Sequence, residues 1–148
     1  LRKQATIESL ARQMRVPIVR LLDGSSGGGS VKSMLQVGYS YLPMMPGFHT
    51  TGAGHALLQE VPVCAVLLGP VVGLGAARAV LSHYSCMVQG TSQLFVAGPP
   101  VVREATGEDV TKEELGGAGI QARCGAVDDV APSEAEALAR AARFLSYL

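Results

Sequence analysis

Residues 62–78, Pro62-Val-Cys-Ala-Val-Leu-Leu-Gly69-Pro-Val-Val-Gly73-Leu-Gly75-Ala-Ala-Arg78, decide how this chain folds. The uncharged apolar run 63–68 is typical of a buried strand. The glycines after it, followed by alanines, predict a tight turn that opens a helix. The first N–H groups of a helix have no partner inside it, so they can donate to an anion or to a carbonyl oxygen that becomes one. The stretch fits an oxyanion hole for acyl or enolate chemistry, although a plain strand-turn-helix junction explains the same residues.

The length fits about one domain, and the composition predicts that this domain contacts other protein. The chain has 148 residues, 48% of them hydrophobic and only 16% charged. So little charge predicts that part of the apolar surface faces other protein. The net charge is zero, so nothing indicates a nucleic-acid partner. No apolar run approaches the roughly 20 residues of a membrane span, so we expect no membrane segment.

The cysteine spacing predicts free thiols, and the first residues predict that the chain is a piece of a longer protein. Cys64, Cys86 and Cys124 are odd in number and widely spaced, which argues against disulfides and a CxxC metal site. We expect them to be reduced core thiols. Residues 1–8 resemble the inside of a helix, so we expect the chain to be a piece of a longer protein.

The segments before the central stretch predict a helix, a strand and a glycine-rich loop. Apolar residues at helical spacing mark an amphipathic helix over 2–15, and Pro17 ends it. A strand is expected over 18–22. Residues 23–30 read Asp-Gly-Ser-Ser-Gly-Gly-Gly-Ser, which suits either a flexible linker or a second loop of the site. We favour the site loop, because it lies between a buried strand and more apolar sequence.

The remaining segments continue an alternation of strands and helices. Helices are expected over 50–60, from Gly98, from Thr111 and from Ser133 to Tyr147. The last two each begin with a capping box, Thr111 with Glu114 and Ser133 with Glu136. Strands are expected over 85–88, 93–96 and 126–130. A strand, a helix and a further strand imply a parallel crossover, so the class is α/β.

Side chains that could carry acid, base or metal chemistry form no recognisable pattern. His49, His55 and His83 show no ligand spacing, and each is expected to be an ordinary surface or core histidine. The carboxylate pairs 113–114 and 128–129 are expected to be solvated faces. Two glycine-rich backbone sites without a nucleophile suit chemistry in which the substrate supplies the reactivity and the protein supplies oriented dipoles.

Several blocks of the chain together resemble one known family. They are Phe95-Val-Ala-Gly-Pro-Pro-Val-Val102, Ala105-Thr-Gly-Glu-Asp-Val110, Glu114-Leu-Gly-Gly-Ala118 and Phe144-Leu-Ser-Tyr-Leu148. With the glycines at 69–76 and the loop after Asp23, they resemble the carboxyltransferase β subunit of biotin-dependent acyl-CoA carboxylases, such as the propionyl-, acetyl- and methylcrotonyl-CoA carboxylases. The resemblance implies a crotonase-like (ClpP/crotonase) fold, a parallel sheet with flanking helices in repeated βαβ-type units.

The resemblance also implies a function. This family moves a carboxyl group from carboxybiotin, held on a partner carrier domain, to the α-carbon or vinylogous carbon of an acyl-CoA through an enolate. Residues 1–148 match part of the N-terminal, acyl-CoA-binding domain, with no internal boundary. The implied partners are acyl-CoA, a biotin carboxylase or biotin carrier subunit, and copies of the chain, since the family is typically hexameric. The implied location is the bacterial cytoplasm or the mitochondrial matrix.

On that basis we place the oxyanion hole at the backbone N–H groups of Gly73, Leu74 and Gly75. Gly27, Gly28 and Gly29 would shape the facing loop and contribute to substrate binding. The α-proton would go to biotin, and no metal is expected.

Three features depart from the family's pattern. Leu74 stands where glycine is common, Gln121 stands where histidine is usual, and the loop after Asp23 is longer. They leave two alternatives open: a biotin-independent carboxyacyl-CoA decarboxylase with the same fold, and a non-catalytic assembly paralogue. The sequence does not identify which acyl group is used.

Overall fold

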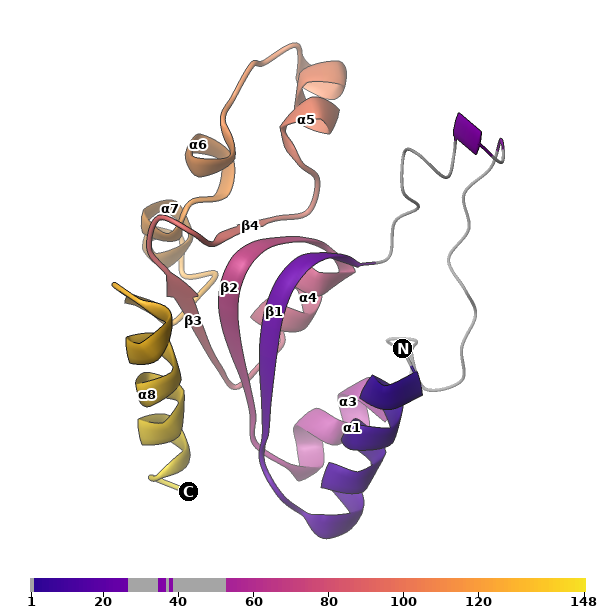
Figure 1. Ribbon diagram of the computed structural model, residues 1–148, viewed down its shortest axis with the longest axis vertical. Coiled ribbons are helices and arrows are strands. Elements are labelled where there is room, and N and C mark those ends of the chain that lie inside the picture. Colours follow the sequence, from indigo (N-terminus) through magenta and orange to yellow (C-terminus); the bar gives the residue numbers. More distant parts are fainter. Residues whose placement is uncertain (1, 27–34, 37, 39–52) are drawn as a thin grey trace. The chain divides into compact units, whose positions relative to one another are not determined.

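A computed structural model describes residues 2–26, 35–36, 38 and 53–148 (Figure 1). The described residues fall into two compact units, the first built from Leu1–Ile18 and Gly28–Val63 and the second from Val19–Gly27 and Cys64–Leu148. Within those described ranges no helix has the length and apolar character needed to cross a membrane.

The first unit contains the helices α1 (Arg2–Met14) and α3 (Ala53–Glu60). Both were predicted, and they pack around Leu57 and Val61. The Arg12 guanidinium donates to the Glu60 carboxylate, with Nε 3.0 Å from Oε2, and this contact lowers the pKa of Glu60. Of the predicted apolar stripe of α1 only Ala11 is buried in the structure, because Ile7, Leu10 and Met14 are at least half exposed.

The second unit is a five-stranded sheet with helices on its faces. Its strands are β1 (Ile18–Ser26), β2 (Val63–Gly73), β3 (Tyr84–Val88), β4 (Gln93–Phe95) and β5 (Asp129–Ala131). Their order is β1-β2-β3-β5, and β4 also pairs with β2. The pairs β2–β3, β2–β4 and β3–β5 are parallel, which confirms the predicted α/β class. The helices are α4 (Leu74–Val80), α5 (Pro99–Thr106), α6 (Lys112–Gly116), α7 (Ala118–Arg123) and α8 (Glu134–Leu145).

Strand β2 is longer than the sequence predicted and changes its neighbour partway. Its first half pairs with β3, up to Leu67 opposite Met87, and its second half pairs with β4 from Pro70 opposite Gln93. The predicted strand ended at residue 68. The real one continues because β4 supplies a second partner, which no local pattern reveals. Gly69 and Pro70 lie at the change of partner, where a residue without a side chain and one without an N–H fit best.

Strand β2 is buried on both faces, so the second unit has two hydrophobic clusters. On one face Ala65, Leu67 and Val71 pack against Ala76 and Ala79 of α4. On the other face Cys64 and Val66 pack with Cys86 against the alanines of α8. Figure 1 shows α4 and α8 on opposite sides of the sheet. Small residues on both helices allow this close approach.

The cysteine predictions are confirmed at two positions and wrong at the third. Cys64 and Cys86 are fully buried, and burial raises the pKa of both thiols. Cys124 is exposed at the end of α7 and donates weakly to the Gln121 carbonyl oxygen. Helix α7 itself was not predicted, because Gly117 ends α6 and at once caps the next helix.

Of the two predicted capping boxes, one is complete. The Thr111 hydroxyl accepts from Glu114 N–H, and the Glu114 carboxylate accepts from Thr111 N–H at 2.9 Å. At α8 the Ser133 hydroxyl accepts from Glu136 N–H, but the Glu136 carboxylate accepts from Arg140 Nε at 3.0 Å instead. That helix also ends at Leu145, two residues before the predicted end.

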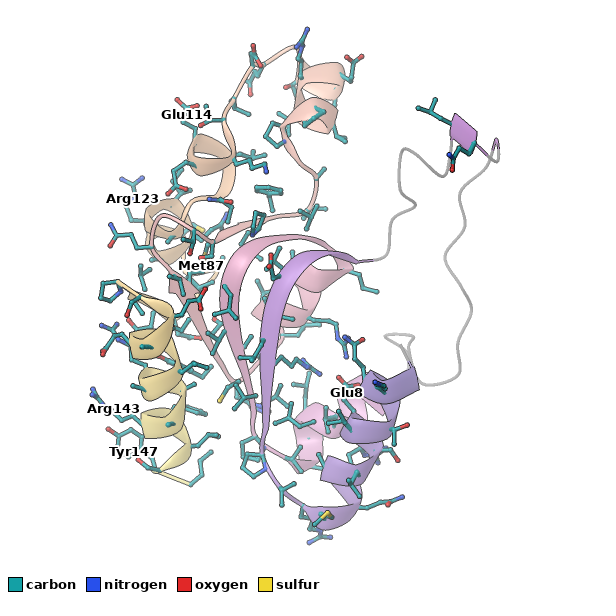
Figure 2. The ribbon with its side chains drawn as sticks, viewed as in Figure 1. Glu8, Met87, Glu114, Arg123, Arg143 and Tyr147 are labelled. Atoms are coloured by element: carbon teal, nitrogen blue, oxygen red, sulfur yellow. The ribbon has the colours of Figure 1, made fainter. Side chains whose placement is uncertain are left out.

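A polar network ties the edge of the sheet to α8. The Tyr84 hydroxyl donates to Asp129 at 3.0 Å, and the Arg140 guanidinium donates to the same carboxylate. The Tyr84 ring stacks on Phe144, with centroids 5.0 Å apart. These residues line a hollow of about 440 Å³, beside which Figure 2 labels Arg143 and Tyr147 on α8. Burial, and then the hydrogen bond to Asp129, raise the pKa of Tyr84 well above its usual range.

The glycines 116 and 119 should respond oppositely to alanine. A Cβ at Gly116 would collide with the Leu94 carbonyl and lie 2.6 Å from Phe95 Cδ1, whereas nothing lies within 4 Å of a Cβ at Gly119. We expect Gly116→Ala to lower the free energy of unfolding by about 2 kcal/mol. Gly119→Ala, inside α7, should raise it by about 0.5 kcal/mol. Urea unfolding measures both, and equal effects would contradict the packing of α6 on β4.

The Tyr84 contact predicts a dependence of stability on alkaline pH. Because the pKa of Tyr84 is raised in the folded chain, its contribution is complete below the ordinary tyrosine pKa of about 10 and is lost as pH rises above it. We expect Tyr84→Phe to flatten the fall in unfolding free energy above about pH 10. Tyr147→Phe is the control, since Tyr147 is 77% exposed. Identical pH profiles for the two variants would refute this assignment.

Candidate functional site

The turn between β2 and α4 has the backbone shape that the sequence predicted. Gly73 has φ 68° and ψ −127°, a conformation that residues with a Cβ rarely adopt. Helix α4 begins at the next residue, Leu74, and no side chain of the described chain caps the turn. The first N–H groups of a helix lack intrahelical acceptors. Gly75 and Ala76 are buried and small, so the main chain of this turn is held tightly from one side.

The neighbouring strand brings a carboxylate against β2. A Cβ added to Gly69 would overlap the side chain of Asp23 on β1 and lie 2.7 Å from its Cγ. Gly69 is therefore glycine because the Asp23 side chain occupies that space. Figure 1 shows β1 and β2 side by side and reaching the same end of the sheet. Sequence reasoning had noted Asp23 only through the family resemblance, and the Gly-Pro pair inside an apolar run was the available signal for Gly69.

The second loop of the predicted site cannot be placed. Gly27, Gly28 and Gly29 lie outside the described residues, so their role remains a prediction. The last described residue before them is Ser26, at the end of β1. The structure thus places Gly73, Leu74 and Gly75 together at one turn and gives no position for the other three.

The carboxylate pair 128–129 serves the fold, although Asp128 is exposed as predicted and Asp129 is partly exposed. The Asp128 carboxylate accepts from the Ser85 N–H at 2.7 Å and from its hydroxyl at 2.8 Å. Asp129 accepts from Val130 N–H at 2.8 Å as well as from Tyr84 and Arg140. Both therefore fix β5 to β3 rather than form an acid and base dyad.

The pair 113–114 likewise serves the fold, although both side chains are exposed as predicted. Glu113 accepts from Gln93 Nε2 at 3.1 Å. Glu114 belongs to the capping box, and its hydrogen bonds to Thr111 lower its pKa. These contacts bind α6 to β4 and close the start of α6.

Of the three histidines, only one has a described side chain. His83 is exposed, His49 lies outside the described residues, and the side chain of His55 does too. Among the described residues no three His, Cys, Asp or Glu side chains come together as a metal site.

Gln121, which departs from the family's pattern, has a definite contact. Its amide Nε2 donates to the Leu94 carbonyl oxygen at 2.7 Å, so α7 is fastened to β4. Leu94 stands opposite Val71 in the register of β4 and β2. Gln121 therefore supports the strand that leads into Gly73.

This arrangement suits electrostatic rather than nucleophilic chemistry. It offers backbone donors at a rigid glycine turn, small buried side chains behind them and a carboxylate on the adjoining strand. Preformed N–H donors stabilise an oxygen that gains negative charge, because they need no reorganisation when the charge appears. An acyl group that becomes an enolate is a substrate of this kind.

Comparisons with known proteins agree on one family. The family model described as "Carboxyl transferase domain" matches residues 2–148. The methylcrotonoyl-CoA carboxylase beta chain of Dictyostelium discoideum is 33% identical over 99% of this chain and 24% of its own length. The methylmalonyl-CoA decarboxylase subunit alpha of Veillonella parvula is 34% identical over 78% of this chain and 21% of its own.

A solved structure shares the fold. The crystal structure of transcarboxylase 12S, described as a hexamer with methylmalonyl-coenzyme A and methylmalonic acid bound, superposes with a TM-score of 0.76 at 27% identity. The match covers 99% of this chain and 27% of that one. The chain thus spans about a quarter of the length of these relatives.

Proposed function

The chain belongs to the carboxyl transferase domain family and has its crotonase-like α/β fold, and from this premise we propose that it is the acyl-CoA-binding part of a biotin-dependent carboxyltransferase. The proposed reaction breaks the C–N bond of a carboxylated biotin and forms a C–C bond at the α-carbon of the thioester. The α-proton leaves to biotin. Biotin would be carried by a partner subunit and supplies the carboxyl group, and the proposal assigns no residue of this chain to it.

The observation that carries the proposal is the glycine turn at the end of β2. Gly73 has positive φ, and α4 follows at once with its first N–H groups lacking intrahelical acceptors. We assign the thioester oxygen to the N–H groups of Gly73, Leu74 and Gly75. Loss of one such donor typically lowers kcat by about 10² to 10³. The proton acceptor need not be a side chain, which agrees with the structural roles of the carboxylates near the sheet.

The facing side of the site is assigned to the loop that follows β1. Asp23 lies against Gly69, so the end of β1 is fixed beside the second half of β2. Gly27, Gly28 and Gly29 follow within a few residues. In the proposal their backbone forms the opposite wall for the acyl-CoA.

The names of the relatives support a proposal for the assembly and the location. Transcarboxylase 12S is described as a hexamer, and the Dictyostelium relative is named as mitochondrial. We propose that this chain acts in a homo-oligomer, together with a biotin carboxylase or biotin carrier subunit. The mitochondrial matrix or the bacterial cytoplasm is the proposed location.

The proposal predicts biotin-dependent loss of a carboxyl group in the reverse direction. The protein in its native assembly is incubated with malonyl-CoA, methylmalonyl-CoA or 3-methylglutaconyl-CoA, with and without free biotin, and the loss of the carboxyl group is followed. We expect loss only when biotin is present. Loss without biotin would instead support the alternative of a biotin-independent carboxyacyl-CoA decarboxylase. Assembly without binding of any acyl-CoA would support a non-catalytic paralogue.

Replacement of Gly73 tests the backbone donors directly. We expect Gly73→Val to reduce turnover more than about tenfold while assembly is unchanged, because a β-branched residue cannot hold this φ and the N–H groups turn away. Gly90→Val is the matched control: Gly90 has φ +79° in the turn before β4, with nothing within 4 Å of a Cβ. Similar backbone strain thus arises away from the donors. Near-normal turnover of Gly73→Val would refute the assignment.

A further inference from the structure

Strand β4 is only three residues long, and it is held from outside by α6 and α7. Gly117 pairs with Gln93 in an antiparallel bridge, and the Gln93 amide donates to Glu113. Gly116 packs so closely on the Leu94 carbonyl that no Cβ fits. The Gln121 amide donates to that same carbonyl oxygen. Figure 2 labels Glu114 on α6 and Arg123 on α7, beside the strand.

The position of β4 determines the position of the glycine turn. Its residues lie opposite Pro70, Val71 and Val72 of β2, and the next residue of β2 is Gly73. Val71 and Leu94 are almost fully buried. A short strand packed at interior density leaves β2 little freedom, so a displacement of β4 is passed to the turn.

Gln121 is the side chain of α7 that reaches the middle of this strand. Its carboxamide is half-buried and its bond to the Leu94 carbonyl is 2.7 Å long, a short N–H to oxygen distance. The side-chain oxygen of Gln121 lies 3.6 Å from Cys124 Sγ, whose single S–H is shared with the Gln121 main-chain carbonyl at 3.3 Å. The bond to the Leu94 carbonyl is therefore the contact that sets the orientation of the amide.

We propose that Gln121 is a positioning residue for the backbone donors of Gly73, Leu74 and Gly75. The inference rests on the proposed function of that turn. In this inference Gln121 acts through the Leu94 carbonyl and β4 and not by contact with the substrate. Without its N–H, the carbonyl loses a donor and the attachment of α7 to the strand is weakened. A shift of about 1 Å in the donors can cost up to roughly 10²-fold in rate.

The test uses Gln121→Glu in the native assembly. Glutamate has the shape of glutamine but places an oxygen instead of an N–H against the Leu94 carbonyl. We expect kcat for biotin-dependent loss of the carboxyl group from methylmalonyl-CoA to fall about tenfold while KM stays within about twofold, because only the transition state needs the aligned donors. Gln121→His keeps a ring N–H and should retain most of kcat. Gln89→Glu, an exposed glutamine given the same charge, should match the wild type.

The outcomes separate this inference from the function on which it rests. No biotin-dependent loss by the wild type, with any of the three carboxyacyl-CoAs, defeats the proposed function and the inference with it. Activity of the wild type with an unchanged kcat in Gln121→Glu overturns the inference alone, even if the melting temperature falls. A raised KM with unchanged kcat overturns it too.

If the wild type does not use methylmalonyl-CoA, kcat and KM are measured with whichever of the three carboxyacyl-CoAs it does use. If Gln121→Glu does not assemble, Gln121→Leu removes the donor without a charge and is judged by the same criteria.

Discussion

The burial of β2 on both faces is the constraint from which the rest of the second unit follows. A strand with no exposed face cannot accept a charge, so it is built from Val, Leu, Ala and Cys until Gly69. It also needs a hydrogen-bonding neighbour along its full length, since an unpaired buried amide or carbonyl is costly. Strands β1 and β3 flank it in the sheet, and β3 and β4 pair with its two halves in turn. The helices α4 and α8 then cover the two faces with alanines.

This constraint explains why the chemistry assigned to the site lies in the main chain. The end of β2 is enclosed by β4, by the buried start of α4 and by Asp23 on the adjoining strand. Little space remains there for a reactive side chain, but the N–H groups at the turn are oriented by everything around them. The carboxylates elsewhere in the unit serve other purposes: Asp128 and Asp129 fix an edge strand, and Glu113 holds β4. Such a core can hold backbone N–H dipoles in fixed orientations.

What the sequence could predict depended on whether the cause was local. The strand over 63–68, the glycine turn that opens a helix after it and the Thr111 capping box all follow from neighbouring residues, and all three are present. The extension of β2 to Gly73 depends on β4, whose residues lie 23 positions further along the chain. The Ser133 capping box is incomplete because Arg140 competes for the Glu136 carboxylate. The spacing of the apolar residues in α1 is the same whether that face is buried or half exposed, so the sequence could not tell the two apart. Gly27, Gly28 and Gly29 still rest on the family resemblance.

The chain between β3 and β5 forms one long connection between two neighbouring strands. It contains β4 and the helices α5, α6 and α7. Its two ends are tied together: Gln89 N–H donates to the Ala131 carbonyl at 2.9 Å, and Asp128 N–H donates to the Ser85 carbonyl at 3.1 Å. The entropy of closing such a loop grows only with the logarithm of its length, about 0.6 kcal/mol for each doubling. Insertions or deletions around α5, away from Gly116 and Gly117 that contact β4, therefore cost the sheet little stability. Evolution can reshape that outer segment while the register of the inner strands stays fixed.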